Sequence, residues 1–408
     1  MTDVIVLGGG PAGMMAAYTA ASYGKTVILL EKNERFGRKL AITGKGRCNV
    51  TNDCDETTFM QNIPTNPKFL YSALRGFDMQ DTKDWFEGRG IPLKTERGNR
   101  VFPVSDKAQD IVGALVRACE EAGVEMRHAE AAELWVEDDV LKGVVLTNGK
   151  KLESAAVIVA TGGKSYPLTG STGDGYRFAE QVGHTVTELK PSLVPLVSNN
   201  EDCRDMQGLS LKNVTAALWD KKTNKAIYEE LGEMLFTHYG MSGPLILSAS
   251  SHIRTFEPDR YEIRIDLKPG LDDKQLDARI LRDFTKFANR DFINALSELL
   301  PKKMIPIIVY RTRIPPFTKV NSITKEQRKA LCDAIRCFAV SVDGFRPIDE
   351  AIVTAGGISC KEVDPRTMES KKCKGLYFAG EVLDVDGYTG GFNLQIAFST
   401  GYAAGVSC

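Results

Sequence analysis

The feature that most constrains the fold of this chain is a glycine-rich turn close to its first residue. Residues 4–7 are all apolar, and they lead directly into residues 8–13, which follow the pattern G-x-G-x-x-G. Residues 14–23 are rich in alanine and methionine, as a helix would be, and residues 26–30 are again mostly apolar. The order strand, turn, helix, strand is typical of a dinucleotide-binding unit.

Each glycine of this turn has its own physical reason. Gly8 permits the tight turn, Gly10 lets the backbone approach a pyrophosphate, and Gly13 lets the helix pack closely on the strand. The start of the helix presents free N–H groups and a positive dipole end to the phosphates. Glu31 ends the second strand, where a carboxylate accepts hydrogen bonds from the adenosine ribose.

The segment after Glu31 favours FAD over NAD as the dinucleotide. Residues 32–52 do not have the pattern of a second crossover helix, and they carry three glycines among basic and hydroxyl side chains. We expect a loop laid along an extended cofactor. Arg38 and Lys39 would neutralise the pyrophosphate, and Cys48 and Asn49 would reach the isoalloxazine ring.

The middle of the chain returns to the same fold. Residues 106–123 have helical apolar spacing, and residues 132–146 predict an antiparallel β-meander. The apolar residues 155–159 then predict a strand that stops at residues 160–163, Ala-Thr-Gly-Gly. Small residues suit a turn whose backbone contacts a cofactor. Residues 171–175 precede a further expected helix and predict a loop near the cofactor.

The C-terminal segment supplies a second half of the site. Residues 375–379 predict a strand that ends at Gly380 and Glu381, and this carboxylate would bind a ribityl hydroxyl. A helix is expected over residues 393–404, opened by Gly390 and Gly391. Its positive end would face the flavin pyrimidine edge, favour the reduced anion and raise the reduction potential.

Together these motifs predict one set of cofactor-binding residues from both ends of the chain. The set is Gly8, Gly10, Pro11, Ala12, Gly13, Glu31, Lys32, Arg38, Lys39, Gly44, Gly46, Cys48, Asn49, Ala132, Ala160, Thr161, Gly162, Gly163, Gly173, Asp174, Gly380, Glu381, Asp386, Gly390, Gly391, Phe392, Asn393, Leu394 and Gln395.

In residues 8–13, 43–52, 160–163, 171–175, 237–244 and 380–395 the chain resembles the BaiN-like and aminoacetone oxidase-like family of FAD-dependent flavoproteins. The resemblance runs along nearly the whole chain. It implies an α/β fold: a two-dinucleotide-type, Rossmann-like FAD-binding domain with an inserted β-domain and a small helical domain. Family members are linked to bile-acid ring reduction and to amine oxidation.

The resemblance places the domain boundaries as follows: residues 1–192 form the first part of the FAD-binding domain, residues 193–268 the inserted β-domain, residues 269–348 the small helical domain, and residues 349–408 the C-terminal part of the FAD-binding domain.

Two side chains are candidates for acid–base catalysis. His238 lies in the insertion, in the run His-Tyr-Gly-Met-Ser-Gly-Pro, and an imidazole is a common general acid or base in enzymes. Its alternative role is that of a turn histidine bonded to the backbone. Tyr388 precedes the C-terminal helix, where its phenol would protonate a carbanion; its alternative role is that of a rim aromatic that stacks on the ligand.

Composition excludes several classes of protein. With 52 basic and 53 acidic side chains the net charge is -1, so we expect a small-molecule substrate and no nucleic-acid partner. No 18-residue apolar run predicts a membrane span, and no leader-like segment precedes the first strand, so a cytoplasmic protein is expected. No motif suggests a metal site. The sequence does not fix an oligomeric state.

These features predict an FAD-dependent oxidoreductase that moves a hydride through flavin N5. One version reduces an activated C=C bond of the bile-acid or steroid enone type. NAD(P)H would then bind transiently as electron donor, because a second glycine triplet for a separate NAD domain is missing. The alternatives are an O2-using oxidase of a small amine or amino ketone, a tRNA-modifying flavoprotein, and a flavin sensor without turnover.

Overall fold

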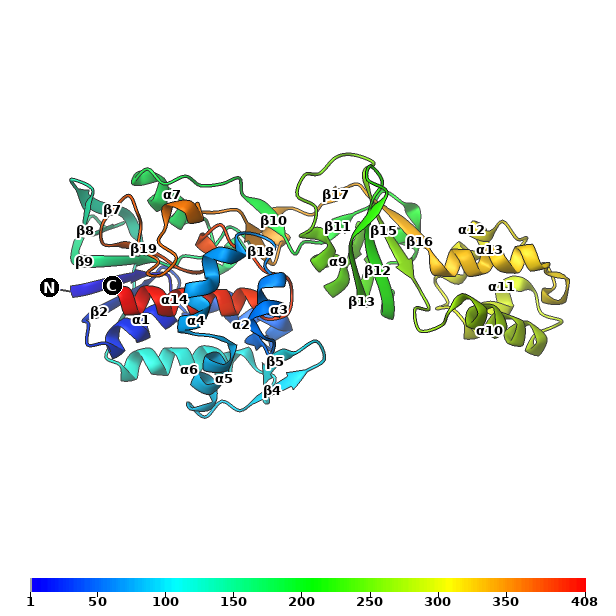
Figure 1. Ribbon diagram of the computed structural model, residues 1–408, viewed down its shortest axis with the longest axis horizontal. Helices are drawn as coiled ribbons and strands as arrows, with labels where there is room; N and C mark the ends of the chain where they lie inside the picture. The colour runs from blue at the N-terminus through cyan, green and yellow to red at the C-terminus, as the bar shows by residue number, and fades with distance from the viewer. Residues whose placement is uncertain (1) are drawn as a thin grey trace. The chain divides into compact units, whose positions relative to one another are not determined.

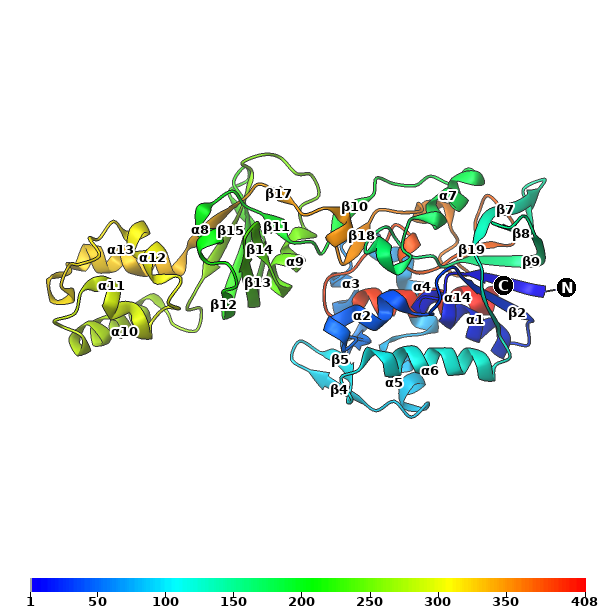
Figure 2. The same ribbon diagram turned by 180° about the vertical axis from the view of Figure 1, so that it is seen from behind.

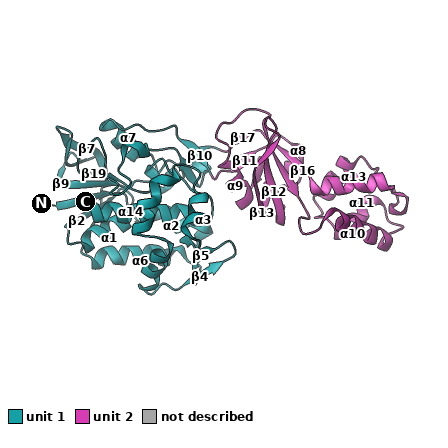
Figure 3. Ribbon diagram, in the orientation of Figure 1, with its two compact units in different colours: residues 1–192, 347–408 teal, residues 193–346 magenta. Residues whose placement is uncertain are grey.

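The computed structural model describes residues 2–408 and divides the chain into two units (Figure 3). Unit 1 comprises Met1–Ser192 and Pro347–Cys408, and unit 2 comprises Leu193–Arg346. Each unit buries its own set of apolar side chains, and the two core clusters share no residue.

Unit 1 is built on a mostly parallel sheet. Strands β1 (Thr2–Leu7), β2 (Val27–Glu31), β6 (Glu125–His128), β9 (Lys151–Val159) and β19 (Leu376–Phe378) run parallel in the order β6-β2-β1-β9-β19. Val4 to Leu7 are buried because helices or other segments cover both faces of such a sheet. The predicted β-meander is present: β7 (Ala131–Glu137) pairs antiparallel with β8 (Val140–Leu146), and β8 pairs antiparallel with β9. The predicted α/β fold class is confirmed.

Two helices from opposite ends of the chain lie side by side in unit 1 (Figures 1 and 2). They are α1 (Pro11–Ser22) and α14 (Phe392–Ser407). A Cβ on Gly401 would lie 2.4 Å from the Ala12 carbonyl oxygen, and one on Gly405 would lie 2.5 Å from that of Ala16. The two contacts advance in step along both helices, so α1 and α14 run parallel.

The remaining elements of unit 1 surround this pair. They are α2 (Arg38–Gly46), β3 (Thr51–Asn52), α3 (Glu56–Gln61), α4 (Tyr71–Gly76), α5 (Met79–Glu87), β4 (Leu93–Glu96), β5 (Arg100–Pro103), α6 (Ala108–Glu121), α7 (Asp174–Gln181), β10 (Lys190–Ser192) and β18 (Val353–Ala355). Strands β10 and β18 pair antiparallel where the chain leaves and re-enters unit 1.

The expectation of a loop over residues 32–52 was wrong in part. Residues from Arg38 onward form α2, whose backbone leaves helical angles at Thr43, Gly44 and Lys45. Leu40 is buried on one side of this helix, and that burial stabilises a turn of helix which the glycine pattern alone does not predict. The extended part of the segment begins only at this kink.

Unit 2 contains an antiparallel sheet and a group of helices. The strand order is β16 (Phe338–Val342), β15 (Tyr261–Asp266), β12 (Ser210–Asp220), β13 (Lys225–Thr237), β14 (Gly240–Ser242), β11 (Leu196–Val197) and β17 (Gly344–Phe345). The helices are α8 (Glu201–Asp205), α9 (Pro244–Ser250), α10 (Asp273–Lys286), α11 (Phe292–Ala295), α12 (Ile305–Thr312) and α13 (Lys325–Arg336). Sheet and helices contribute to one core, and the division of the insertion into two domains stays a prediction.

Candidate functional site

The predicted motifs meet at the carboxyl ends of four parallel strands in unit 1. Strand β1 ends just before Gly8, β2 at Glu31, β9 just before Ala160 and β19 shortly before Gly380. Backbone bonds join these ends: the Gly8 N–H donates to the Leu30 carbonyl at 2.8 Å, and the Ala160 N–H to the Leu7 carbonyl at 2.9 Å. Ligands of open parallel sheets bind at this edge.

The three fingerprint glycines differ in what surrounds them. A Cβ on Gly8 would lie 2.5 Å from the Ala160 carbonyl oxygen, and one on Gly13 would lie 1.9 Å from that of Gly8. Both positions therefore require glycine, because any side chain there would collide with the protein backbone. A Cβ on Gly10 would meet nothing within 4 Å. The fold leaves space at Gly10, where the backbone is expected to approach a pyrophosphate.

Glu31 is held in place and keeps acceptor capacity. The carboxylate is 9% exposed; its Oε2 accepts from the Gly9 N–H at 2.8 Å, and its Oε1 accepts from the Asn33 N–H at 2.9 Å and from the Asn33 amide group. Because a carboxylate offers about four acceptor positions, one remains for a ligand hydroxyl. The same Asn33 accepts from Arg38 at 2.7 Å, which ties the first basic residue of α2 to the end of β2.

The N-termini of α1 and α14 lie on the same side, and α14 begins before α1 along the N-to-C direction that the two helices share. Nine residues separate Phe392 from Gly401, the neighbour of Ala12, which corresponds to about 13 Å of helix. Neither helix has an acidic residue in its first turn. Two positive helix ends spaced in this way suit an extended cofactor with a pyrophosphate at one end and a flavin at the other.

The segment after the kink in α2 contacts the start of α14. A Cβ on Gly391 would lie 2.3 Å from the Thr51 carbonyl oxygen, and the Asn52 amide donates to the Gly390 carbonyl at 2.9 Å. Asn393 closes the preceding loop, since its side chain donates to the Gly387 carbonyl at 2.7 Å and accepts from the Gly387 N–H at 2.9 Å.

Three predicted site residues present buried oxygen atoms without a partner among the described residues. They are Asn49 Oδ1, Thr161 Oγ1 and Asp386 Oδ1. The other Asp386 oxygen accepts from the Ser192 hydroxyl at 2.9 Å. Buried polar atoms in folded proteins almost always find a partner, so these three atoms fit a ligand that brings its own hydrogen-bonding groups. With the space at Gly10, they match FAD.

Two basic side chains of the site, Lys39 and Lys32, are paired with carboxylates. Lys39 lies 2.8 Å from Glu381, whose carboxylate also accepts from the Ser165 hydroxyl and the Thr354 N–H. Lys32 lies 2.5 Å from Asp174 at the start of α7. Glu381 can therefore accept a hydrogen bond from a ribityl hydroxyl only at the acceptor positions of its carboxylate that these donors do not occupy.

Three residues of the predicted cofactor-binding set have side chains that are buried in the core. Cys48 and Gln395 are fully buried, and Phe392 is 4% exposed and packs on Phe59 with ring centroids 5.4 Å apart. Burial raises the pKa of the Cys48 thiol to about 12, so the thiol stays neutral. The Gln395 amide accepts from Thr51 at 2.6 Å and binds other protein groups with its NH2. These side chains therefore lie in the core, and contact of their residues with the cofactor stays a prediction.

The other predicted cofactor residues lie along the same edge. Pro11 and Ala12 begin α1; Gly44 and Gly46 follow the kink in α2; Gly162, Gly163 and Gly173 lie in the turn and loop after β9; and Leu394 is in the first turn of α14. Ala132 is on β7, and its carbonyl accepts from Arg177 of α7. These assignments stay predictions.

The two catalytic candidates are in different units. Tyr388 is half-buried in unit 1, and its backbone N–H donates to the Asn62 carbonyl at 3.0 Å. His238 is exposed in unit 2 on the turn between β13 and β14, where its ring contacts Tyr239 edge-on. Both roles stay predictions.

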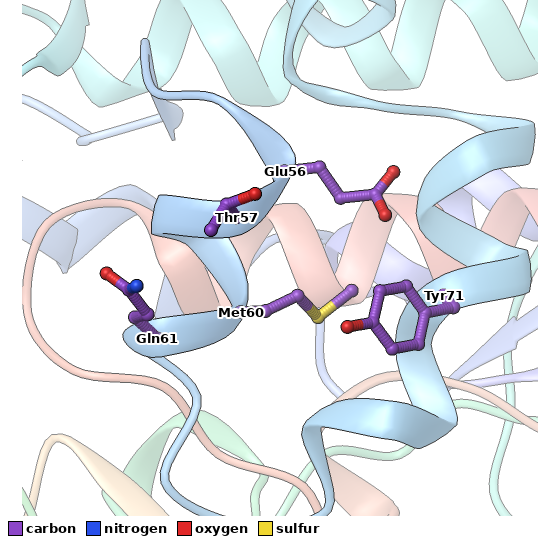
Figure 4. A pocket seen from close by; sticks show the side chains of 5 residues that line it. All are labelled: Glu56, Thr57, Met60, Gln61 and Tyr71. Carbon is purple, nitrogen blue, oxygen red and sulfur yellow. The ribbon is translucent and has the colours of Figure 1, made fainter.

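A separate cavity of about 260 Å³ lies at the surface of unit 1 (Figure 4). Glu56, Thr57, Met60, Gln61 and Tyr71 line it, and the Tyr71 ring and the Met60 side chain point toward each other. None of these residues belongs to a strand end of the parallel sheet, so this cavity is distinct from the cofactor site.

Sequence reasoning missed the residues that hold the site together. Asn33, Ser165, Thr354, Thr51 and Thr82 orient Glu31, Glu381 and Gln395. Each is a common small polar residue without a motif of its own. Thr51 is distinguished only by its hydrogen bond to Gln395, 344 positions away in the sequence, and no sequence pattern predicts such a contact.

Two kinds of feature are absent from residues 2–408. No group of three or more His, Cys, Asp or Glu side chains is placed to hold a metal ion. None of the helices described there combines the length and apolar character needed to cross a bilayer.

Comparisons with known proteins match nearly the whole chain. The model of the HI0933-like protein Rossmann domain matches residues 2–407. The 3-dehydro-bile acid delta(4,6)-reductase of Clostridium scindens is 31% identical over 99% of this chain and 98% of its own length. The ribosomal RNA dihydrouridine synthase of Escherichia coli is 32% identical over 98% of this chain and 96% of its own length.

The solved structures show the fold alone. The 3-ketosteroid delta1-dehydrogenase from Sterolibacterium denitrificans superposes with a TM-score of 0.52 at 13% identity, covering 99% of this chain and 98% of that one. The 3-ketosteroid-delta4-(5alpha)-dehydrogenase from Rhodococcus jostii gives 0.50 at 15% identity, covering 100% of this chain and 96% of that one.

Proposed function

The chain belongs to the HI0933-like family of FAD-dependent Rossmann oxidoreductases, and from that premise we propose that it reduces a carbon–carbon double bond conjugated to a carbonyl group. The net change adds one hydride and one proton across the double bond. The hydride would come from NAD(P)H, which becomes NAD(P)+. The cell compartment that fits this donor is the cytoplasm.

One observation carries the proposal. Two relatives that match over nearly their full length have names that describe the same bond change on different molecules. A Δ4,6-unsaturated 3-dehydro bile acid has its ring double bonds conjugated to a ketone, and the uracil of uridine has one conjugated to its own ring carbonyl. Dihydrouridine is uridine with that bond reduced. The shared element is the activated double bond rather than the molecule around it.

The residues of unit 1 would hold FAD in the following way. The start of α1 and the space at Gly10 would receive the pyrophosphate, and Glu31 would bind the adenosine ribose. The first turn of α14 would face the pyrimidine edge of the flavin. Bound FAD supplies the hydride carrier at N5. The positive helix end would stabilise negative charge on the reduced ring and so favour reduction.

The proton must come from a side chain or from water. Tyr388 is our first candidate, because its loop is fixed on both sides by the Asn62 carbonyl and by Asn393. His238 is the second. Either group would deliver the proton to the carbon next to the carbonyl, while the hydride goes to the carbon beyond it.

A two-step mixing experiment tests the reaction. The FAD-loaded protein is reduced without O2, by NADH, NADPH or light, and is then mixed with androst-4-ene-3,17-dione, with a uridine-containing RNA, or with O2. We expect one of the two conjugated substrates to reoxidise the flavin rapidly, with a product two mass units heavier, and O2 to react slowly. The saturated ketone is the control and should not react.

Rapid reoxidation by O2 with release of peroxide, and no reaction with either conjugated substrate, would contradict the proposal and favour an amine oxidase. In the same assay Tyr388→Phe and His238→Ala are compared with Tyr23→Phe, which removes an exposed phenol after α1. The residue that donates the proton is the one whose loss slows reduction and changes its pH profile while FAD content is kept. If neither does, water supplies the proton.

A further inference from the structure

The near-zero charge of the chain conceals a strongly basic region in unit 2. Residues 269–337, which include α10 to α13, contain 14 Lys and Arg but only eight Asp and Glu, a net charge of +6. The whole chain carries -1. The expectation that no nucleic acid binds rested on the net charge of the whole chain, and that value does not describe residues 269–337.

More than half of these cations lie outside the ion pairs of the described residues. Arg279, Lys286, Arg311, Lys319, Arg328 and Arg336 each lie within 4 Å of a carboxylate. The remaining eight cations are all exposed and belong to none of those pairs: Lys274, Arg282, Arg290, Lys302, Lys303, Arg313, Lys325 and Lys329. Their positive charge is thus presented to solvent.

Two aromatic side chains stand out among these cations. Tyr310 in the last turn of α12 is 83% exposed, and Phe317 in the following loop is 75% exposed. The apolar neighbours of Tyr310 on α12, such as Ile308 and Val309, are buried. Burial of the helix therefore does not require an aromatic at position 310, and a side chain of this size so exposed indicates an interaction surface.

The loop that carries Phe317 is fixed by backbone bonds on both sides. The Ile293 N–H donates to the Pro316 carbonyl at 3.1 Å, and the Phe292 N–H donates to the Thr318 carbonyl at 2.8 Å. Arg290 lies beside it, since its carbonyl accepts from the Val320 N–H at 3.1 Å. The loop, α11 and α12 belong to one group of helices (Figure 1).

Arg313 occupies a position that the backbone would give to glycine. It ends α12 with φ of 58°, in the left-handed region, and its N–H donates to the Tyr310 carbonyl at 3.1 Å. Glycine adopts this conformation at lower cost. An arginine here places a guanidinium one turn from Tyr310 and four residues before Phe317.

We propose that Arg290, Tyr310, Arg313 and Phe317, called here the basic–aromatic face, bind single-stranded RNA. The cations would contact phosphates, and the two rings would stack on bases. This inference rests on the proposed function, in which uracil is one of the molecules that carry the reducible double bond, and it names RNA as the substrate class.

Two other occupants fit the face less well. A membrane-binding helix presents a continuous apolar face, whereas α12 turns its aliphatic side chains into the core and leaves Tyr310 outside. An acidic protein would satisfy the cations without a use for two fixed, solvated rings. Stacking accounts for rings and cations together.

Binding of the FAD-loaded full chain to a fluorescein-labelled, uridine-containing RNA tests the proposal. The RNA should exceed about 16 nucleotides, the upper site size of a single-strand-binding module. We expect binding that weakens as salt rises. Tyr310→Ala with Phe317→Ala should weaken it by about tenfold per ring, and Arg290→Ala with Arg313→Ala should also reduce its salt dependence. Tyr23→Ala with Arg117→Ala, two exposed side chains of unit 1, is the matched control.

The outcomes separate this inference from the proposed function. If the variants lose RNA binding but still reduce androst-4-ene-3,17-dione, or are still reduced by NAD(P)H at the wild-type rate, the face binds RNA and the flavin site is intact. No RNA binding at low salt, equal binding by all variants, or stronger binding to phosphatidylserine vesicles than to RNA would overturn the inference. None of these results would touch the reduction of the enone.

Discussion

Units 1 and 2 use their residues in different ways. In unit 1 the candidate site is largely backbone: strand ends, helix starts and glycines such as Gly8, Gly10 and Gly13. In unit 2 the candidate surface is made of exposed side chains such as Arg313 and Phe317. The charges differ as well. Unit 2 has 24 basic and 20 acidic residues, a net charge of +4, and unit 1 has 28 and 33, a net charge of -5.

This difference explains why the site of unit 1 can be recognised in the sequence and the surface of unit 2 cannot. A backbone site needs glycine at fixed spacings, and those spacings form a motif. A surface of cations and aromatics has no required spacing, because the fold alone brings its members together. Separate cores also mean that a change in one unit should leave the other intact, and the following predictions use that separation.

The largest effect is expected from Gly13→Ala. The new methyl carbon would lie 1.9 Å from the Gly8 carbonyl oxygen, which is backbone and cannot rotate away. Helix α1 must then move off β1, at a cost of about 3 kcal/mol or more. Hydrogen exchange resolved by unit should show loss of protection in unit 1 and none in unit 2.

The matched control is Gly113→Ala, the same change inside α6. The new methyl would meet only the mobile end of Arg117, at 3.1 Å, and alanine improves the helix by up to about 1 kcal/mol. If Gly13→Ala melts both units together, the two cores do not fold separately and the comparison fails.

Gly10→Val should remove the cofactor without removing the fold. Gly10 has φ of -82° and ψ of -177°, which valine adopts readily, and its Cβ would meet no protein atom within 4 Å. The side chain would instead occupy the path of the pyrophosphate. We expect a colourless protein whose two units unfold in urea like those of FAD-free wild type, and partial FAD content for Gly10→Ala. Retention of full FAD by the valine variant would refute the assignment of this space.

Much of unit 1 could be predicted from the sequence because its motifs are local. The fingerprint, Glu31 at the end of β2 and the helix after Gly391 all appear where the sequence places them. The motifs do not predict the surroundings of side chains whose neighbours lie far away in the sequence. The amide oxygen of Gln395 accepts hydrogen bonds from Thr51 and Thr82, both more than 300 positions away in the sequence. Cys48 lies in a core that residues from both ends of the chain form.

Unit 2 was less predictable for a related reason. Residues 305–309 form an apolar run without helical periodicity, so the sequence does not predict α12. That helix is buried on most sides. Its exposed aromatic side chain, Tyr310, becomes informative only after the structure shows that Ile307, Ile308 and Val309 are buried.

The smallest predicted effect concerns acid stability and compares one histidine in each unit. Burial, with Arg254 nearby, lowers the pKa of His252 in unit 2 from 6.5 to about 4. Burial also lowers the pKa of His184 in unit 1, but there Glu362 acts in the opposite direction. An unfolded histidine takes up a proton near pH 6.5, whereas folded His252 does not. The unfolded state is therefore favoured as pH falls from 6.5 toward 4. Since one pKa unit corresponds to about 1.4 kcal/mol, and His252 is only partly shielded, unit 2 should lose on the order of 2 kcal/mol over this range. His252→Gln should reduce the pH dependence of the unfolding free energy of unit 2 and leave that of unit 1 unchanged. His184→Gln should reduce the pH dependence of unit 1, by a smaller amount. Urea unfolding at pH 7 and pH 5, followed by hydrogen exchange in each unit, measures both slopes; equal slopes in wild type and His252→Gln would mean that carboxylates, not this histidine, set the acid sensitivity of unit 2.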